Sequence, residues 1–409
     1  MLALLGVLIF LFAASHGTET LLYTGVERCT TQTTTIIIGA SVKEIPNRAF
    51  GPPKKLTALQ KRMKEFPCKN VHTVDFSAAI ALTSIGDYAF QFTAIEHVTF
   101  PPQLKTIGHG AFMGITALTT LDFSLASSLV SIGNVYPVLD DHSEDEEAQR
   151  GVSKSVQEGS FMECGNLTSV VLPESLVSLG DAAFLSCHAL TEVMLPDSLR
   201  VIGTGAFIEC SALERIVLPA GLTSLGMGAF SKCSNLRSIS GGELAAGGLD
   251  GDGDDGEAED GVLPLALRKI GDGTFNGCEK LEAIVLPDSV KSIGFAAFQK
   301  NTALRSMVLP RSLHTVKAGA FDGCVNLWVN QSLVLPPKLA SIGRLAFQGV
   351  SLDSNFLLTF LSSHSFVYSL SHPTLSLALS LARSLARSRA LSRSLSRSRS
   401  LALALALAL

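Results

Sequence analysis

A phenylalanine that returns every 23 residues is the feature that most constrains how this chain can fold. Two runs show the spacing, and their members are Phe161, Phe184, Phe207, Phe230 in the first and Phe275, Phe298, Phe321 in the second. A fixed period of this length is typical of solenoids, in which one structural unit is stacked on the next. We therefore expect an array of repeats and not a set of separate globular domains.

The clearest copy of the repeat reads LPESLVSLGDAAFLSCHALTEVM and starts at Leu172. One copy has too few apolar side chains to offset the entropy lost in ordering its backbone, so neighbouring copies must stack. The segment Leu190 to Leu195 is predicted to be a strand with Val193 and Leu195 pointing inward, because side chains alternate along a strand. Pro196 then ends it, since proline cannot donate a ladder hydrogen bond. Gly180 and Gly203 are expected where the chain turns tightly.

This unit resembles the BspA-type leucine-rich repeat, written roughly LPxSLxxIGxxAFxxCxxLxxI, and the resemblance covers about residues 36–350. It implies a leucine-rich-repeat solenoid of the α/β-type horseshoe class, curved and right-handed. Short parallel strands would lie on its concave side and irregular turns on its convex side. The resemblance also implies adhesion or another protein-binding role, which is an inference from analogy and not from chemistry.

Segments outside the repeat complete the predicted organisation. Residues 1–17 carry the apolar run LALLGVLIFLFAA followed by small residues, which predicts a secretory signal peptide; an uncleaved anchor or a buried segment is the alternative. Residues 18–35 form an N-terminal flank. Residues 351–409 form a low-complexity tail, disordered or artefactual, whose alternation of Leu or Arg with Ser or Ala has the regularity of a translated microsatellite.

Three insertions are predicted near residues 51–70, 134–157 and 241–262. The first holds the basic stretch KKLTALQKRMKEF, which could form an amphipathic helix. The other two hold the acidic runs DDHSEDEE and LDGDGDDGEAEDG. The second run begins like a calcium-binding EF-hand loop, but Asp255 stands where glycine is needed and Gly261 where glutamate is needed. Solvated acidic loops are the preferred interpretation.

Six cysteines follow the repeat phenylalanine by three residues, namely Cys164, Cys187, Cys210, Cys233, Cys278 and Cys324. Their period predicts a buried ladder of free thiols, because parallel side chains on adjacent rungs are poorly placed to bridge. Cys29 and Cys68 lie outside this position. In an oxidising compartment they could pair and close the N-terminal end.

The sequence contains no arrangement typical of catalysis, so we expect no enzyme, no catalytic residue, no metal site and no cofactor. Histidines and cysteines lack zinc-ligand spacing, and nucleophile-elbow and phosphate-loop motifs are missing. The net charge of −4 argues against a dedicated nucleic-acid binder. A small-molecule substrate is not expected either.

If the strands stack in register, one outward column becomes an apolar stripe, and it is the predicted partner-binding site: Val171, Met194, Val217, Val285, Val308 and Val334. The adjacent column is small and polar, from His97 and Thr120 to Ser332. A contiguous exposed apolar stripe is a candidate interaction surface. The alternative is that valine simply suits a parallel strand.

Asn166 and Asn330 lie in glycosylation sequons, which matter only in a eukaryotic secretory route. The leading hypothesis is a secreted or cell-surface scaffold that binds a protein or another surface ligand through its concave face. One alternative is the sensing ectodomain of a larger receptor or enzyme, such as a kinase, whose remaining domains are absent. The other is an intracellular interaction scaffold, if the N-terminal segment is not a signal.

Overall fold

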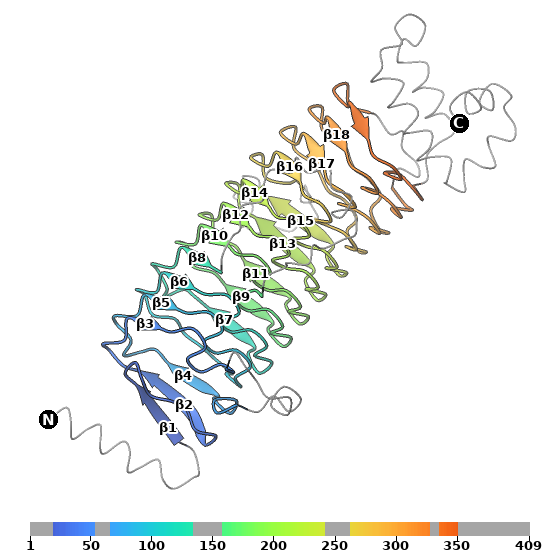
Figure 1. The fold of residues 1–409 in the computed structure, drawn as a ribbon. Coiled ribbons are helices and arrows are strands. Elements are labelled where there is room, and N and C mark those ends of the chain that lie inside the picture. Colours follow the sequence, from blue (N-terminus) through green and yellow to red (C-terminus); the bar gives the residue numbers. More distant parts are fainter. Residues whose placement is uncertain (1–18, 54–65, 134–157, 242–261, 328–334, 351–409) are drawn as a thin grey trace, which may run out of the picture. The chain divides into compact units, whose positions relative to one another are not determined.

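The computed structural model describes residues 19–53, 66–133, 158–241, 262–327 and 335–350. The chain divides into two compact units, one of residues 1–139 with 155–211 and the other of residues 140–154 with 212–409. Every regular element in the described ranges is a β-strand, and every pairing is parallel (Figure 1). The predicted leucine-rich-repeat solenoid is therefore confirmed, built from strands and turns.

Longer strands form the first ladder of the first unit. Their bounds are β1 Glu19–Tyr23, β2 Thr33–Ile38, β4 Thr73–Asp75, β7 Thr120–Asp122, β9 Ser169–Val171 and β11 Glu192–Met194. Single bridges at His97 and Thr99 connect β4 to β7 where the repeat between them is too irregular for a strand. Strand β1 and the start of β2 come from the predicted N-terminal flank, so the parallel ladder starts ahead of Ile36.

A second ladder of two-residue strands runs through the first unit, and the sequence analysis missed it. Its strands are β3 Glu44–Ile45, β5 Ser84–Ile85, β6 Thr106–Ile107, β8 Ser131–Ile132, β10 Ser178–Leu179 and β12 Val201–Ile202. They pair in exact register, as Leu179 does with Ile132 and Ile202. The repeat thus has two strands, one before the LP dipeptide and one in the SLxxIG segment, and not the single strand expected.

The second unit has the same two ladders. Its longer strands are β13 Arg215–Leu218 and β15 Ser238–Gly241, and its short strands are β14 Ser224–Leu225, β16 Lys269–Ile270, β17 Ser292–Ile293, β18 Thr315–Val316 and β19 Ser341–Ile342. The longer ladder continues beyond β15 as single bridges, Val262 with Val285 and Ala283 with Ser306. Strands β16 to β19 pair successively with no shift of register.

Stacked phenylalanine rings fill the core between the ladders. In the first unit Phe161 stacks on Phe112 at 5.2 Å and on Phe184 at 5.6 Å between ring centroids. In the second unit Phe298 stacks on Phe275 and on Phe321, both at 5.4 Å. These rings are fully buried, so each contributes a large apolar area as well as a ring-to-ring contact. The regular stack explains why phenylalanine is the residue that marks the period.

Two of the predicted insertions interrupt the sequence but not this stack. Phe112 and Phe161 are in contact although residues 134–157 separate their repeats, and Phe230 and Phe275 stack at 5.9 Å across residues 242–261. Both ring contacts are expected if the insertions leave the flanking repeats in phase. The inserted residues themselves lie outside the described ranges, as do the basic stretch at 54–65, the signal-like segment and the tail.

Glycine at the predicted tight turn has a different role from the one expected. Gly203 has no positive φ; a Cβ there would lie 2.5 Å from Asp181 Oδ1 and 2.6 Å from the Asp181 amide nitrogen. The small residue therefore permits close approach of the preceding repeat. The left-handed conformation falls two residues later, at Gly205, where φ is 65°.

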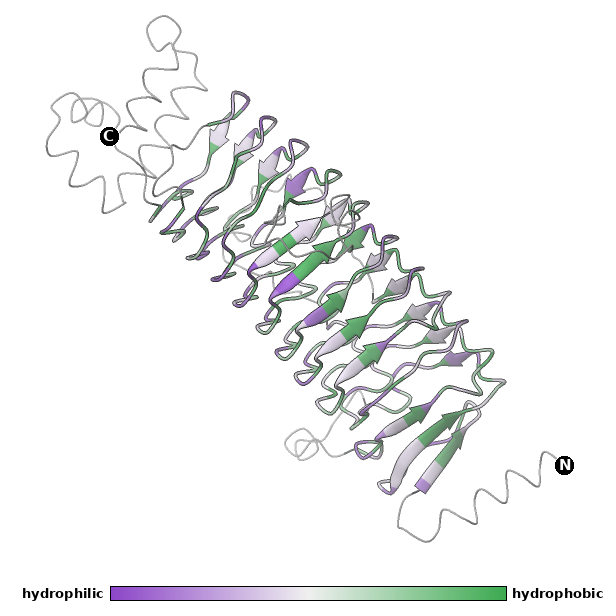
Figure 2. Cartoon of the chain, turned by 180° about the vertical axis from the view of Figure 1, so that it is seen from behind, coloured by the Kyte–Doolittle hydropathy of each residue, from purple (hydrophilic) through white to green (hydrophobic). Residues whose placement is uncertain are grey.

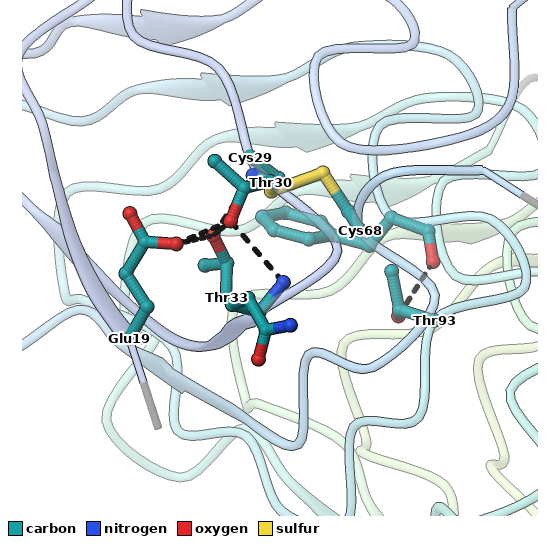
Figure 3. Close-up of a disulfide and its surroundings, with 8 residues drawn as sticks. Glu19, Cys29, Thr30, Thr33, Cys68 and Thr93 are labelled. Carbon is teal, nitrogen blue, oxygen red and sulfur yellow. Dashed lines mark hydrogen bonds between the residues drawn. A yellow bond between two sulfur atoms is a disulfide. The ribbon is translucent and has the colours of Figure 1, made fainter. Parts of the chain in front are cut away.

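The cysteines outside the repeat position secure the N-terminal end of the first unit. Cys29 and Cys68 form a disulfide with their Cα atoms 5.3 Å apart, and both side chains are buried (Figure 3). Beside it the Thr30 hydroxyl donates to the Glu19 carboxylate, and the Thr30 amide donates to Thr33 Oγ1 at 3.0 Å. The loop between β1 and β2 is thereby tied to the segment that precedes β4.

Candidate functional site

The outward column of the longer strands in the first unit is set by the register of three strands. Met194 of β11 lies opposite Val171 of β9, and Val171 lies opposite Asp122 of β7. Val170 and Val193, the neighbours of Val171 and Met194 in their strands, are buried, whereas Met194 is 59% exposed. Side-chain alternation therefore turns Val171 and Met194 to solvent, as the sequence analysis expected, with Asp122 ending the apolar run on that side.

In the second unit the same column contains Val217, Val285 and Val308, all exposed, and Val308 is 74% exposed. Ser240 lies opposite Val217, so a hydroxyl interrupts the valines. Val262 pairs with Val285 and belongs to the column, although the sequence analysis had assigned it to an insertion. Val334 lies outside the described residues. We call the exposed apolar members the apolar stripe of each unit, which is Val171 and Met194 in the first unit and Val217, Val285 and Val308 in the second.

The neighbouring column is polar in both units. Thr120, Ser169 and Glu192 are in register in the first unit, and Arg215 faces Ser238 in the second. Figure 2 shows the result along the longer strands, where hydrophobic segments coloured green adjoin pale or purple polar ones. Within each unit the stripe is therefore a set of apolar side chains bordered by hydroxyls and charges. Such a set can bury apolar area against a partner while its polar border supplies hydrogen bonds.

The repeat cysteines are buried free thiols, as predicted. The Cys187 thiol donates a hydrogen bond to the Phe161 carbonyl at 3.3 Å, and the Cys324 thiol donates to the Phe298 carbonyl at 2.9 Å. Burial raises the pKa of the Cys164 thiol to about 12. Since the thiolate is the nucleophile, these cysteines are structural hydrogen-bond donors and not reactive groups.

Metal sites, membrane-spanning helices and cavities are the remaining candidate features in the described ranges. Those residues contain no group of three histidine, cysteine, aspartate or glutamate side chains placed to hold a metal ion. They also contain no helix of the length and hydrophobicity needed to cross a bilayer. A shallow cavity of about 310 Å³ lies in the second unit between β14 and β16 and is lined by Thr223, Ser224, Leu225, Ala266, Arg268 and Lys269.

Asn166 is an exposed sequon residue whose side chain already has a structural role. Its Nδ2 donates to the Thr116 carbonyl at 2.8 Å, and Asn326, at the same place in its own repeat, donates to the Thr302 carbonyl at 2.8 Å. The asparagine thus joins adjacent turns in these two repeats. Glycosylation of Asn166 stays a prediction, and Asn330 lies outside the described residues.

The repeat geometry agrees with the comparison to known families. The profile described as the BspA type leucine rich repeat region matches residues 63–135, 154–243 and 257–372, in six copies. The chain belongs to the BspA-type leucine-rich repeat family. As a BspA-type repeat protein it is a scaffold built from stacked repeats. Membership of this repeat family suggests interaction with a protein or a surface.

Solved structures similar to this BspA-type chain come from several bacteria. A leucine-rich repeat protein from Bacteroides ovatus is 25% identical, with 82% of this chain and 89% of that chain covered and a TM-score of 0.49. A leucine-rich cell surface protein from Faecalibacterium prausnitzii is also 25% identical, with 83% and 84% covered and a TM-score of 0.37. The pneumococcal vaccine antigen PcpA is 19% identical, with 83% and 74% covered and a TM-score of 0.40. No curated protein matches the chain.

Proposed function

We propose that this chain is an exported or cell-surface scaffold that binds a protein partner through the apolar stripe of its longer strands. The observation that carries the proposal is that each unit presents exposed apolar side chains beside its longer ladder, with Met194 of the first unit held in register with Val171 and 59% exposed, and Val308 of the second unit 74% exposed. Parallel pairing fixes the backbone beneath them, so little backbone entropy is lost on binding. The stripe needs no catalytic group, which suits a chain whose repeat thiols are all buried.

Export is supported by two features of the N-terminal region. The first 14 residues carry the apolar run of a secretory signal, and Cys29 and Cys68 are joined in a disulfide. Disulfides persist in oxidising compartments and are rare in the cytosol of mesophiles. Expression of the complete chain in a secreting host, followed by N-terminal sequencing of the product in the medium, tests this part of the proposal. Retention of Met1 on a cytosolic product would contradict it.

The binding role is tested by removing apolar character from the stripe while keeping strand propensity. Met194→Thr and Val308→Thr do this, because threonine suits a strand as well as valine does but carries a hydroxyl. Val177→Thr is the matched control, since Val177 is 45% exposed but precedes a short strand, β10, away from the stripe. Each variant is applied to an array of purified secreted and extracellular-matrix proteins beside the unmodified chain.

We expect the stripe variants to weaken binding to any captured protein by at least tenfold, because hot-spot residues near an interface centre carry most of the affinity. The control should change it less than twofold. Urea unfolding midpoints should be the same for all three variants. Equal loss of binding in the control, or unchanged binding in both stripe variants, would mean that the valines serve only the strand.

A further inference from the structure

A column of basic side chains lies on the short-strand ladder of the second unit, separate from the longer strands that carry the apolar stripe. The Lys291 amide donates to the Arg268 carbonyl and the His314 amide donates to the Lys291 carbonyl, both at 2.8 Å. These backbone bonds place the three residues on successive rungs, about 4.8 Å apart as in any parallel ladder. Lys269 adjoins Arg268 and begins β16. All four side chains are exposed.

Nothing in the described part of the chain neutralises the start of this column. No described carboxylate lies within ion-pair distance of Arg268, Lys269 or Lys291. The nearby ion pair is further along, where Lys317 Nζ lies 3.5 Å from Asp272 Oδ1. Asp288 is also exposed on this side, and its carboxylate accepts a hydrogen bond from the Arg311 amide. Like charges on adjacent rungs repel one another, so the arrangement costs the free chain stability.

The equivalent column of the first unit avoids this repulsion. Backbone bonds there connect, rung by rung, Lys43, Thr83, Lys105, Val130, Val177 and Arg200. A neutral side chain therefore separates each cation from the next. The repeat does not require cations at this position, and their accumulation is particular to the second unit. In Figure 2, β16, which begins with Lys269, is purple, whereas β17 and β18, which begin with Ser292 and Thr315, are pale.

A row of hydroxyls lies directly beside the cations. Ser292 of β17, Thr315 of β18 and Ser341 of β19 are in register with one another and with Lys269. At the near end Thr223 and Ser224 line the shallow cavity together with Arg268 and Lys269. The ladder thus presents a line of positive charge next to a line of hydroxyl groups, both running across the strands.

We propose that this surface, the cationic column Arg268, Lys269 and Lys291 with its adjoining hydroxyls, binds a linear anionic polysaccharide. Such a polymer carries carboxylate or sulfate groups at a regular spacing along one thin chain, and its free hydroxyls suit a serine and threonine border. Single-stranded nucleic acid fits less well, because its binding relies on exposed aromatic rings. The one aromatic side chain among the described residues flanking these strands, Phe295, is half buried. This proposal does not depend on the apolar stripe.

The test measures binding of two fluorescent probes, a heparin fragment and a polygalacturonate fragment, to the full-length protein by anisotropy. Neutral dextran, polyglutamate and single-stranded DNA serve as comparison ligands. We expect the anionic polysaccharides to bind with a Kd that rises with salt, since exposed charges are screened. Dextran should not bind, and polyglutamate and DNA should bind more weakly than the polysaccharides.

The triple variant Arg268→Ser, Lys269→Ser, Lys291→Ser should weaken polysaccharide binding about tenfold. Its matched control is Lys43→Ser, Lys105→Ser, Arg200→Ser in the first unit, which removes the same charge and should change the Kd less than twofold. Lys291→Arg, which keeps the charge, should bind like the unmodified chain. Equal weakening by both triple variants would overturn the site, and tighter binding of polyglutamate or DNA would overturn the ligand class. The stripe variants Met194→Thr and Val308→Thr should leave this Kd unchanged.

Discussion

Asn301 is the residue at which the cysteine ladder of the second unit is broken, and replacing it with cysteine should stabilise the fold. It follows Phe298 by three residues, where the neighbouring repeats on both sides have Cys278 and Cys324. The side chain is fully buried, at 0% exposure, and neither its Nδ2 nor its Oδ1 has a hydrogen-bond partner. On the rungs to either side, the Cys278 thiol donates to the Phe230 carbonyl at 3.2 Å and the Cys324 thiol donates to the Phe298 carbonyl at 2.9 Å.

The expected gain follows from these contacts. A buried polar group without a partner costs about 1–3 kcal/mol. Asn301→Cys removes both unpaired amide atoms, and the register of the ladder lets the new thiol donate to the Phe275 carbonyl. We therefore expect the free energy of unfolding to rise by about 1–3 kcal/mol. For a unit of this size, that corresponds to a rise in Tm of roughly 2–12 °C.

Urea unfolding in the presence of a reductant measures this change as a higher midpoint with an unchanged slope. Asn301→Ala is the matched control, since it also removes the orphaned amide but supplies no thiol donor and leaves a small void. It should gain less than the cysteine variant. An Asn301→Cys protein with an equal or lower midpoint would refute the reasoning and would indicate that a buried water satisfies the asparagine.

Two further predictions concern the cysteines. Reduction of Cys29–Cys68, or the double variant Cys29→Ser, Cys68→Ser, should lower the free energy of unfolding of the first unit by up to about 4 kcal/mol, because the disulfide closes a loop of 39 residues. The loss is measured as a lower urea midpoint, and an unchanged midpoint would contradict the prediction. Because burial raises the pKa of Cys164 from 9.0 to about 12, the unfolded chain releases its proton first, and stability should fall as pH rises from 9 to 12. Cys164→Ala should reduce that slope, and a midpoint constant up to pH 11 would exclude the mechanism.

The periodicity of one chain was enough to predict the repeat, its buried phenylalanines and the free thiols of its cysteines. These features depend on residues within a single 23-residue unit, where apolar spacing reports directly which side chains face inward. The same alternation predicted that Met194 would be exposed and Val193 buried. Inward and outward positions can be predicted in this way because each repeat contains the apolar spacing that decides which of its side chains are buried.

Tertiary structure decided which short strands pair with one another between neighbouring repeats. A two-residue strand such as β10, Ser178–Leu179, is too short to have a period, and its hydrogen bonds exist only once the neighbouring repeats are stacked. The same stacking brings Arg268 and Lys291 onto adjacent rungs and leaves the buried Asn301 amide without a partner. The sequence by itself determined the unit and its inward face. The register between neighbouring repeats, which depends on backbone bonds between residues about one repeat apart, determined the second ladder, the cationic column and the unpaired amide.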